Sequence, residues 1–210
     1  MTSADETLVY LVDDDAAVRD ALALLIRSIG LKAKAYGDPA EFLADIKGDE
    51  IGCLVLDIRM PELNGFAVQE RLNAMGCNLP IILITGHGDM AQCRRAFRAG
   101  AVDFLTKPVD ENALIESLQT AIHRGREQQG MRQQINEARD QMSRLTPRER
   151  SVFDLVCDGL QNKLIADRLY LSLRTVEAYR ASIFEKLEVT SVADLVRLRL
   201  IGNDRQNLIP

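Results

Sequence analysis

The chain has 210 residues, of which 47% are hydrophobic and only 5% aromatic, and its formal net charge is −5. This length suits two domains with aliphatic cores. The apolar runs are far shorter than the roughly 20 residues that span a bilayer, and the polar, acidic first residues do not resemble a secretory signal. We therefore expect a cytoplasmic protein without a membrane partner, whose four cysteines stay reduced.

The charge is distributed unevenly along the chain. Residues 1–123 contain 11 Lys and Arg against 19 Asp and Glu, whereas residues 140–210 contain 11 against 10. The acidic first part suits cation binding and repels nucleic acid. The nearly neutral last part does not exclude DNA, but any contact with DNA must come from one local face.

Short apolar runs alternate with amphipathic segments over the first 123 residues. This alternation predicts βαβ units and a parallel sheet. Five such units fit a flavodoxin-like (βα)5 fold with the strand order 2-1-3-4-5. The predicted strands lie near 7–13, 32–36, 51–57, 80–85 and 101–106, and the predicted helices near 15–29, 39–47, 64–75, 89–99 and 110–123.

Polar side chains stand where the strands end. Asp13 and Asp14 follow the first strand, Asp57 ends the third, Thr85 ends the fourth, and Lys107 follows the fifth. The carboxyl ends of parallel strands are where open α/β sheets bind ligands. Carboxylates suit Mg²⁺, and an aspartate can accept a phosphoryl group whose charge a cation, an ammonium and a hydroxyl neutralise. The sequence therefore predicts Mg²⁺-dependent phosphoryl transfer to Asp57.

Four motifs stand at the ends of the predicted strands: Val12-Asp-Asp-Asp15, Leu56-Asp-Ile-Arg-Met-Pro61 with Gly65, Thr85-Gly-His-Gly-Asp89, and Lys107-Pro108. Together they resemble the receiver domain of a two-component response regulator across residues 7–122. The third motif and Gly100-Ala-Val-Asp-Phe-Leu105 resemble its FixJ-like branch most closely.

The resemblance implies that Asp57 accepts phosphate from a sensor histidine kinase. It also implies that Asp13, Asp14 and Asp57 hold Mg²⁺ with the backbone carbonyl of Arg59, and that Thr85, Lys107 and Phe104 form the switch. Two points stay open. Phe104 is either the switch aromatic or an ordinary core residue, and His87 is a candidate general base for hydrolysis of the phosphoryl group.

Residues 124–142 are rich in Arg, Gln and Glu, and we expect a helical linker there. Its apolar residues recur at spacings of 4, 3, 4 and 3. This pattern fits either a solvated helix or about two heptads of coiled coil. The residues concerned are Met131, Ile135, Ala138, Met142 and Leu145.

From Thr146 onward the sequence predicts only helices, which begin at Thr146, Asn162, Ser172 and Ser191 as caps. Two of them, joined by a tight turn, have the proportions of a helix-turn-helix. Three blocks resemble an all-α, four-helix LuxR-type (NarL/FixJ) DNA-binding domain: Leu145-Thr-Pro-Arg-Glu-Arg150, Gly159-Leu-Gln-Asn-Lys-Leu-Ile-Ala166 and Thr175-Val-Glu-Ala-Tyr-Arg180. The expected division is a receiver at 1–123, the linker at 124–142 and the DNA-binding domain at 143–210.

The recognition helix is expected to bury Val176, Ile183 and Leu187 and to lay its other face in the major groove. Glu177 departs from the Lys common in the wider family and puts the base readout in doubt, and Arg180 is either a phosphate contact or a residue packed at the core edge. The expected DNA-binding residues are Asn162, Lys163, Arg174, Thr175, Glu177, Ala178, Arg180, Ala181 and Ser182.

The two resemblances imply a transcription factor that phosphorylation switches, not an enzyme, although the receiver assists its own Mg²⁺-dependent phosphorylation and dephosphorylation. Phosphorylation is expected to drive homodimerisation through 89–99 and 101–106, binding to paired DNA half-sites and contact with RNA polymerase. Arginines on 89–99 are either solvated or paired across the dimer with Asp103, Asp110 and Glu111. The alternatives are an aspartyl-phosphate phosphohydrolase and a DNA-binding protein with a passive receiver.

Overall fold

The computed structural model describes residues 7–48, 50–86 and 90–203. The chain divides into two compact units, Met1–Gln129 and Gly130–Ile209, which we call the N-terminal and C-terminal units. Helix α5 (Glu111–Ser143) contributes residues to both. Within the described ranges, no helix combines the length and the apolar character needed to cross a bilayer.

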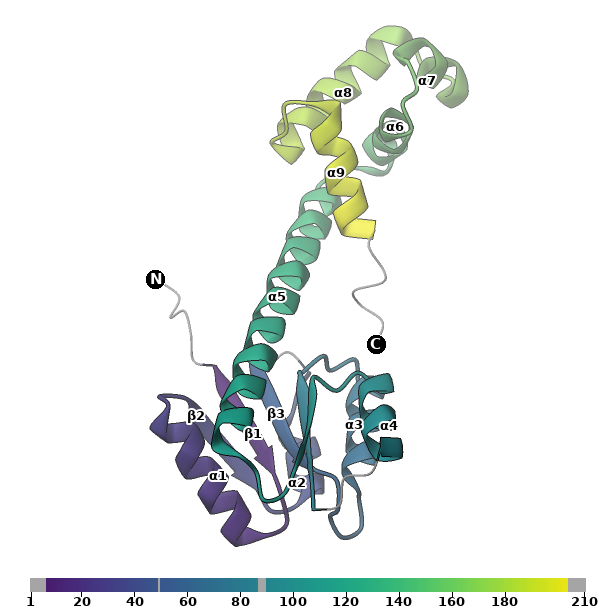
Figure 1. The fold of residues 1–210 in the computed structure, drawn as a ribbon. Coiled ribbons are helices and arrows are strands. Elements are labelled where there is room, and N and C mark those ends of the chain that lie inside the picture. The colour runs from purple at the N-terminus through teal and green to yellow at the C-terminus, as the bar shows by residue number, and fades with distance from the viewer. Residues whose placement is uncertain (1–6, 49, 87–89, 204–210) are drawn as a thin grey trace. The chain divides into compact units, whose positions relative to one another are not determined.

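The N-terminal unit is a five-stranded parallel sheet with the order β2-β1-β3-β4-β5, as predicted (Figure 1). The strands are β1 (Leu8–Val12), β2 (Lys32–Tyr36), β3 (Gly52–Asp57), β4 (Ile81–Thr85) and β5 (Asp103–Thr106). The helices that precede α5 are α1 (Ala16–Ser28), α2 (Pro39–Asp45), α3 (Gly65–Ala74) and α4 (Met90–Arg98).

Two apolar cores lie on the two faces of this sheet. Successive strand residues point to opposite faces, so Leu54 of β3 joins the core that contains Phe42 of α2, whereas Val55 joins the core that contains Ile26 of α1 and Leu114 of α5. Central strands covered on both faces need uninterrupted apolar runs, which explains the sequences of β3 and β4.

Short-range signals in the sequence set the ends of α1 and α2. The Asp15 carboxylate accepts hydrogen bonds from the backbone N–H groups of Ala17 and Val18, and Asp38 accepts one from Ala40. Gly30, with a φ of 82°, follows the end of α1. Because Asp15 is occupied as a helix cap, only Asp13 and Asp14 remain for chemistry at the end of β1.

The apolar stripe of the linker is buried except at Met131, which neither sequence interpretation anticipated. Ile135, Ala138 and Met142 of α5 are buried inside the C-terminal unit. Gly202 packs closely on them, since a Cβ there would lie 2.1 Å from the Met142 Cε atom, and its carbonyl accepts a hydrogen bond from Arg139 Nε at 3.0 Å. Residues 130–142 are therefore neither a fully solvated helix nor an open coiled-coil seam.

The remainder of the C-terminal unit consists of α6 (Pro147–Cys157), α7 (Asn162–Leu169), α8 (Leu173–Leu187) and α9 (Val192–Asn203). The Thr146 capping box, the Ser172 cap and the reciprocal bonds between Ser191 and Asp194 confirm three predicted starts. The Asn162 cap was wrong: Gln161 is the cap residue of α7, without a side-chain bond, and Asn162 is its first helical residue.

Replacing Ile135 by Ala should lower the free energy of unfolding of the C-terminal unit by about 2–4 kcal/mol, because it empties a fully buried site. Denaturant unfolding followed by circular dichroism measures this loss. Met131→Ala is the matched control, because Met131 lies on the same helix and is 44% exposed. Equal losses in the two variants would show that the stripe is not buried in solution.

Candidate functional site

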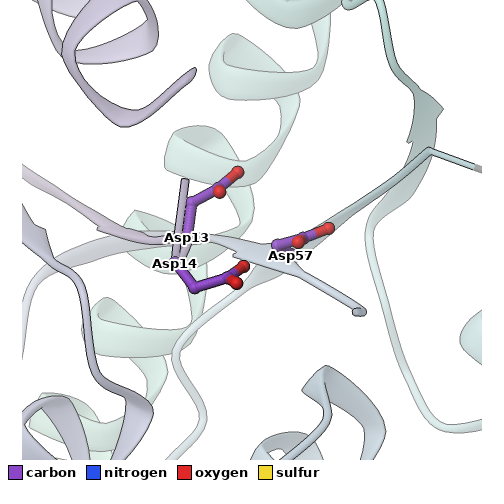
Figure 2. Close-up of side chains that lie close together, drawn as sticks. All are labelled: Asp13, Asp14 and Asp57. Carbon is purple, nitrogen blue, oxygen red and sulfur yellow. The ribbon is translucent and has the colours of Figure 1, made fainter. Parts of the chain in front are cut away.

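Three carboxylates meet at the carboxyl end of the sheet. Asp13 and Asp14 follow β1, and Asp57 is the last residue of the neighbouring strand β3. One carboxylate oxygen from each residue lies within 4.8 Å of the others, and Figure 2 shows the three side chains side by side. Asp13 and Asp57 are buried, whereas Asp14 is exposed. This grouping matches the set expected from the sequence to hold a divalent cation.

Lys107, the residue that follows β5, brings one positive charge to these acids. Its ammonium lies 2.8 Å from Asp13 Oδ2 and 3.3 Å from Asp57 Oδ2. Its backbone N–H donates to the carbonyl of Thr85 at 2.7 Å, and the Lys107-Pro108 peptide bond is cis. The lysine is thereby tied to the end of β4 while its side chain bridges the acids from β1 and β3.

The Asp57 carboxylate is incompletely satisfied. Burial raises the pKa of Asp57 above its usual value; the charge of Lys107 opposes this shift and that of Asp13 adds to it. Burial also disfavours the Lys107 ammonium, but its hydrogen bond to Asp13 and the charge of Asp57 outweigh that effect and raise the pKa of Lys107. Among the described residues, Asp57 Oδ1 is buried without a hydrogen-bond partner. An orphaned oxygen beside two further carboxylates fits an Mg²⁺ site.

Two residues that follow β3, Arg59 and Gly65, lie close to Asp57. The backbone N–H of Arg59 donates to the Asp57 carboxylate, while the Arg59 side chain is exposed. Gly65 opens α3 against this segment, since a Cβ at Gly65 would lie 2.5 Å from the carbonyl oxygen of Asp57. The motif that contained Gly65 was recognised in the sequence, but this reason for the glycine needed the structure.

The other expected switch residues lie on the two neighbouring strands. Thr85 is fully buried at the end of β4, and Phe104 of β5 is half-buried against the core on the α2–α4 side. This position of Phe104 agrees with either role considered for it. His87 lies outside the described residues.

The charges near α4 have partners within their own chain. The Arg95 guanidinium lies 4.4 Å from the centre of the Phe66 ring and 3.2 Å from Glu70 Oε1. Asp103 accepts a hydrogen bond from the hydroxyl of Ser117, and Asp110 accepts one from the backbone N–H of Ala113. Arg94, Arg95 and Arg98 are exposed, which agrees with a solvated face, and pairing of these arginines across a dimer stays a prediction.

The helix-turn-helix presents a polar face on α7 and α8. Val176, Ile183 and Leu187 are buried as predicted, so α8 packs on the core by that stripe. Exposed candidates for DNA contact are Lys163, Arg174, Glu177, Ala178 and Ala181, and half-buried candidates are Asn162, Thr175 and Arg180.

Ser182 does not face away from the core, and that prediction was wrong. Its hydroxyl donates to Glu149 Oε1 at 2.7 Å, and Lys186 donates to Glu149 Oε2 at 2.7 Å. The backbone N–H of Thr146 also donates to Glu149 Oε2 at 2.8 Å. These bonds, with Lys186 the largest influence, lower the pKa of Glu149 to about 2. The helical periodicity of the sequence placed Ser182 on the polar face of α8. It could not show that a buried acid on another helix accepts a hydrogen bond from it.

Comparison with known families identifies both units. The profile described as "Response regulator receiver domain" matches residues 9–119, and the profile described as "Bacterial regulatory proteins, luxR family" matches residues 143–199. This chain belongs to the response regulators with a LuxR-type DNA-binding domain.

Relatives of this response regulator match along most of its length. It is 42% identical to the response regulator protein TmoT of Ectopseudomonas mendocina, covering 92% of this chain and 88% of that one. It is 40% identical to the transcriptional regulatory protein FixJ of Azorhizobium caulinodans, covering 92% of each. The solved structure of response regulator StyR matches with a TM-score of 0.83 at 38% identity, covering 93% of this chain and 98% of that one. The FixJ-like branch expected from the motifs is thus confirmed.

Membership has direct consequences for chemistry and partners. Receiver domains generally bind Mg²⁺, and the Asp13, Asp14 and Asp57 cluster is the acidic group found in the described part of this one. A receiver domain implies a sensor kinase as partner, and a LuxR-family domain implies DNA binding. The response regulator is therefore a transcription regulator.

The Glu149 network predicts a pH dependence of the C-terminal unit. Folding lowers the pKa of Glu149 from 4.5 to about 2, so its contribution to stability is fully present above pH 4.5 and is lost as pH falls toward 2. We expect unfolding midpoints of wild type and Glu149→Gln to differ most near neutral pH and to converge in acid. Glu185→Gln, an exposed site on α8, is the control. Parallel pH profiles for wild type and Glu149→Gln would contradict the network.

Proposed function

We propose that a sensor histidine kinase switches this response regulator by transferring one phosphoryl group to Asp57. The observation that carries the proposal is the Lys107 ammonium, which bridges Asp13 and Asp57 at the edge of a three-carboxylate cluster. Asp13, Asp14 and Asp57, with the backbone carbonyl of Arg59, would hold Mg²⁺. Bound there, Mg²⁺ supplies positive charge to the phosphoryl oxygens.

Residues of this chain have distinct tasks in the transfer. An oxygen of Asp57 forms the new bond to phosphorus as the bond to the donor's leaving group breaks. Lys107 exchanges a carboxylate oxygen for a phosphoryl oxygen, and the Thr85 hydroxyl donates to another. The receiver thus assists its own phosphorylation, and later its hydrolysis, without acting as an enzyme on other substrates.

The consequence of the transfer is proposed to be dimerisation and DNA binding. Movement of Thr85 toward the phosphoryl group leaves room for Phe104 to turn inward, and the surface of α4 and β5 then pairs two copies. We assign the receiver to residues 1–123, the helical linker to 124–142 and the output domain to 143–210. A dimer reads two half-sites about one turn of DNA apart, and the DNA-bound dimer contacts RNA polymerase.

For base readout we propose Glu177 and Ala178, with Arg174 reaching a guanine or a phosphate. Asn162, Lys163, Thr175, Arg180 and Ala181 are proposed to contact or approach the DNA backbone. Ser182 is left out because Glu149 occupies its hydroxyl.

The sequence lacks the general acid that a phosphohydrolase function requires. Such an enzyme commonly places a second carboxylic acid two residues after the nucleophile. Arg59 occupies that position here, and its exposed guanidinium cannot donate or accept the proton in this way. A passive receiver is left as the alternative that labelling decides.

Incubation with a small acyl phosphate and Mg²⁺ should add the mass of one phosphoryl group to wild type but none to Asp57→Ala. Asp20→Ala, at an exposed acid on α1, should label like wild type, and a chelator should prevent labelling. Intact-mass spectrometry measures the adduct, and light scattering on the same samples should find dimers only where the adduct forms. An adduct on Asp57→Ala, or none on any protein, would overturn the proposal.

Lys163→Ala should weaken binding of the phosphorylated protein equally for all DNA sequences and reduce the salt slope by about 1, because it removes a phosphate contact. Glu177→Ala should instead relax preference at one base pair, by about 1–3 kcal/mol. Fluorescence anisotropy on selected and altered sites at several salt concentrations separates the two effects. Arg168→Ala, in the last turn of α7, should change neither. The assignment fails if Lys163→Ala alters sequence preference or Glu177→Ala leaves it intact.

A further inference from the structure

The three carboxylates at the sheet edge are not held equally. Asp13 is bonded to Lys107 and, through Oδ1, to the backbone N–H of Asp15 at 2.9 Å. Asp57 is bonded to Lys107 and to the N–H of Arg59. Asp14 is exposed, and within the described part of the chain its carboxylate has no hydrogen bond or ion pair. The direction of the Asp14 side chain therefore depends on its own backbone.

Arg19 holds that backbone. Its Nη1 donates to the carbonyl oxygen of Asp13 at 2.7 Å. This carbonyl belongs to the planar peptide unit that joins Asp13 to Asp14, so its orientation sets where the Asp14 side chain leaves the main chain. The backbone N–H of Arg19 also donates to the carbonyl of Asp15 at 2.9 Å, in the first turn of α1. Arg19 is thus fixed to the same loop that it restrains.

A second element confines the guanidinium. Gly37 directly follows β2, and a Cβ at Gly37 would lie 3.2 Å from Arg19 Nη1 and 3.4 Å from its Cζ. Beside it, the backbone N–H of Asp13 donates to the carbonyl of Tyr36 at 3.2 Å. The guanidinium therefore lies close to both the end of β2 and the Asp13 carbonyl, at a position where glycine leaves it room.

We propose that Arg19 is a positioning residue for the Mg²⁺ ligand Asp14. By fixing the Asp13–Asp14 peptide, it directs the one carboxylate without a partner toward Asp57, although Arg19 itself does not contact the cation. This inference rests on the proposed function of the cluster, and it adds a residue to which the sequence motifs had assigned no role.

The direction in which Mg²⁺ affinity changes when Arg19 is replaced distinguishes a positioning role from a purely electrostatic one. A positive charge beside acids repels a cation, so its removal strengthens Mg²⁺ binding if charge alone acts. Loss of a group that orients a metal ligand instead weakens binding, typically 10–100-fold. Opposite signs are thus expected from the two explanations of the same substitution.

Isothermal titration of the full-length protein with Mg²⁺ tests the proposal. Arg19→Gln should raise the dissociation constant about 10-fold or more, and Arg19→Lys, which keeps a donor, should raise it less. Gly37→Ala keeps every charge and places a Cβ 3.2 Å from Arg19 Nη1, which shifts the guanidinium by a few tenths of an ångström. It should therefore weaken binding in the same direction, but less than Arg19→Gln does. Arg27→Gln, an exposed arginine in the last turn of α1, is the matched control and should bind as wild type does.

Labelling by a small acyl phosphate supplies a second readout, because no kinase has to dock. The Arg19→Gln protein should need more Mg²⁺ for its half-maximal rate, and the rate should recover at saturating Mg²⁺. A folding defect would not recover in this way. If Arg19→Gln does not fold, as circular dichroism would show, Gly37→Ala decides the question.

Two failures can be told apart. The role of Arg19 alone would be overturned by one set of results. In that set, wild type labels on Asp57 and binds Mg²⁺, while the Arg19→Gln and Gly37→Ala proteins bind Mg²⁺ as tightly or more tightly. Wild type that neither binds Mg²⁺ nor accepts the phosphoryl group would overturn the proposed function, and the role of Arg19 with it.

Discussion

The interaction on which the receiver depends is the contact of one ammonium, Lys107, with the carboxylates of Asp13 and Asp57. Three carboxylates within 4.8 Å repel one another, and two of them are buried where water screens little. The sheet order β1-β3-β4-β5 brings the acids and the lysine together from the carboxyl ends of three different strands, β1, β3 and β5. The cores on both faces of the sheet thus hold together carboxylates whose mutual repulsion Lys107 offsets only in part. This remaining repulsion is the physical basis for the proposed response of the site to Mg²⁺ and a phosphoryl group.

Helix α5 has two separate buried stripes, one in the N-terminal unit and one in the C-terminal unit. Leu114, Leu118 and Ala121 belong to the core of the N-terminal unit, whereas Ile135, Ala138 and Met142 are buried in the C-terminal unit. No residue between Ile122 and Ile135 is buried, and that whole stretch is described. Each end of the helix therefore packs within its own unit. The stretch between the two stripes is stabilised by its helical hydrogen bonds and by side-chain contacts such as that of Arg126 with the Thr7 hydroxyl.

The features that the sequence revealed were those encoded locally. Alternating apolar runs give the sheet, because strands covered on both faces must be apolar throughout, and polar residues at strand ends then identify Asp57 and Lys107. Features that depend on distant partners were missed. The stripe at Ile135 shows its period but not which surface covers it, Ser182 is bonded to an acid 33 residues away, and Arg19 acts on a carbonyl that no motif displays. The predicted start of α7 was also wrong by one residue. Asn is preferred over Gln at the N-cap, which favoured Asn162, but in the structure Gln161 is the N-cap residue.

The Glu149 network limits how the proposed phosphorylation of Asp57 could act on DNA binding. Ser182 and Lys186 of α8 both donate to Glu149 of α6, whose carboxylate also accepts from Thr146 at the start of that helix. A buried carboxylate that lost these donors would be left unpaired, at a cost of several kcal/mol. The recognition helix is therefore fixed to α6 in one orientation, and its base-reading face exists before any signal arrives. The proposed control by Asp57 would then change how many such faces act together or whether they are accessible, rather than reshape the face itself.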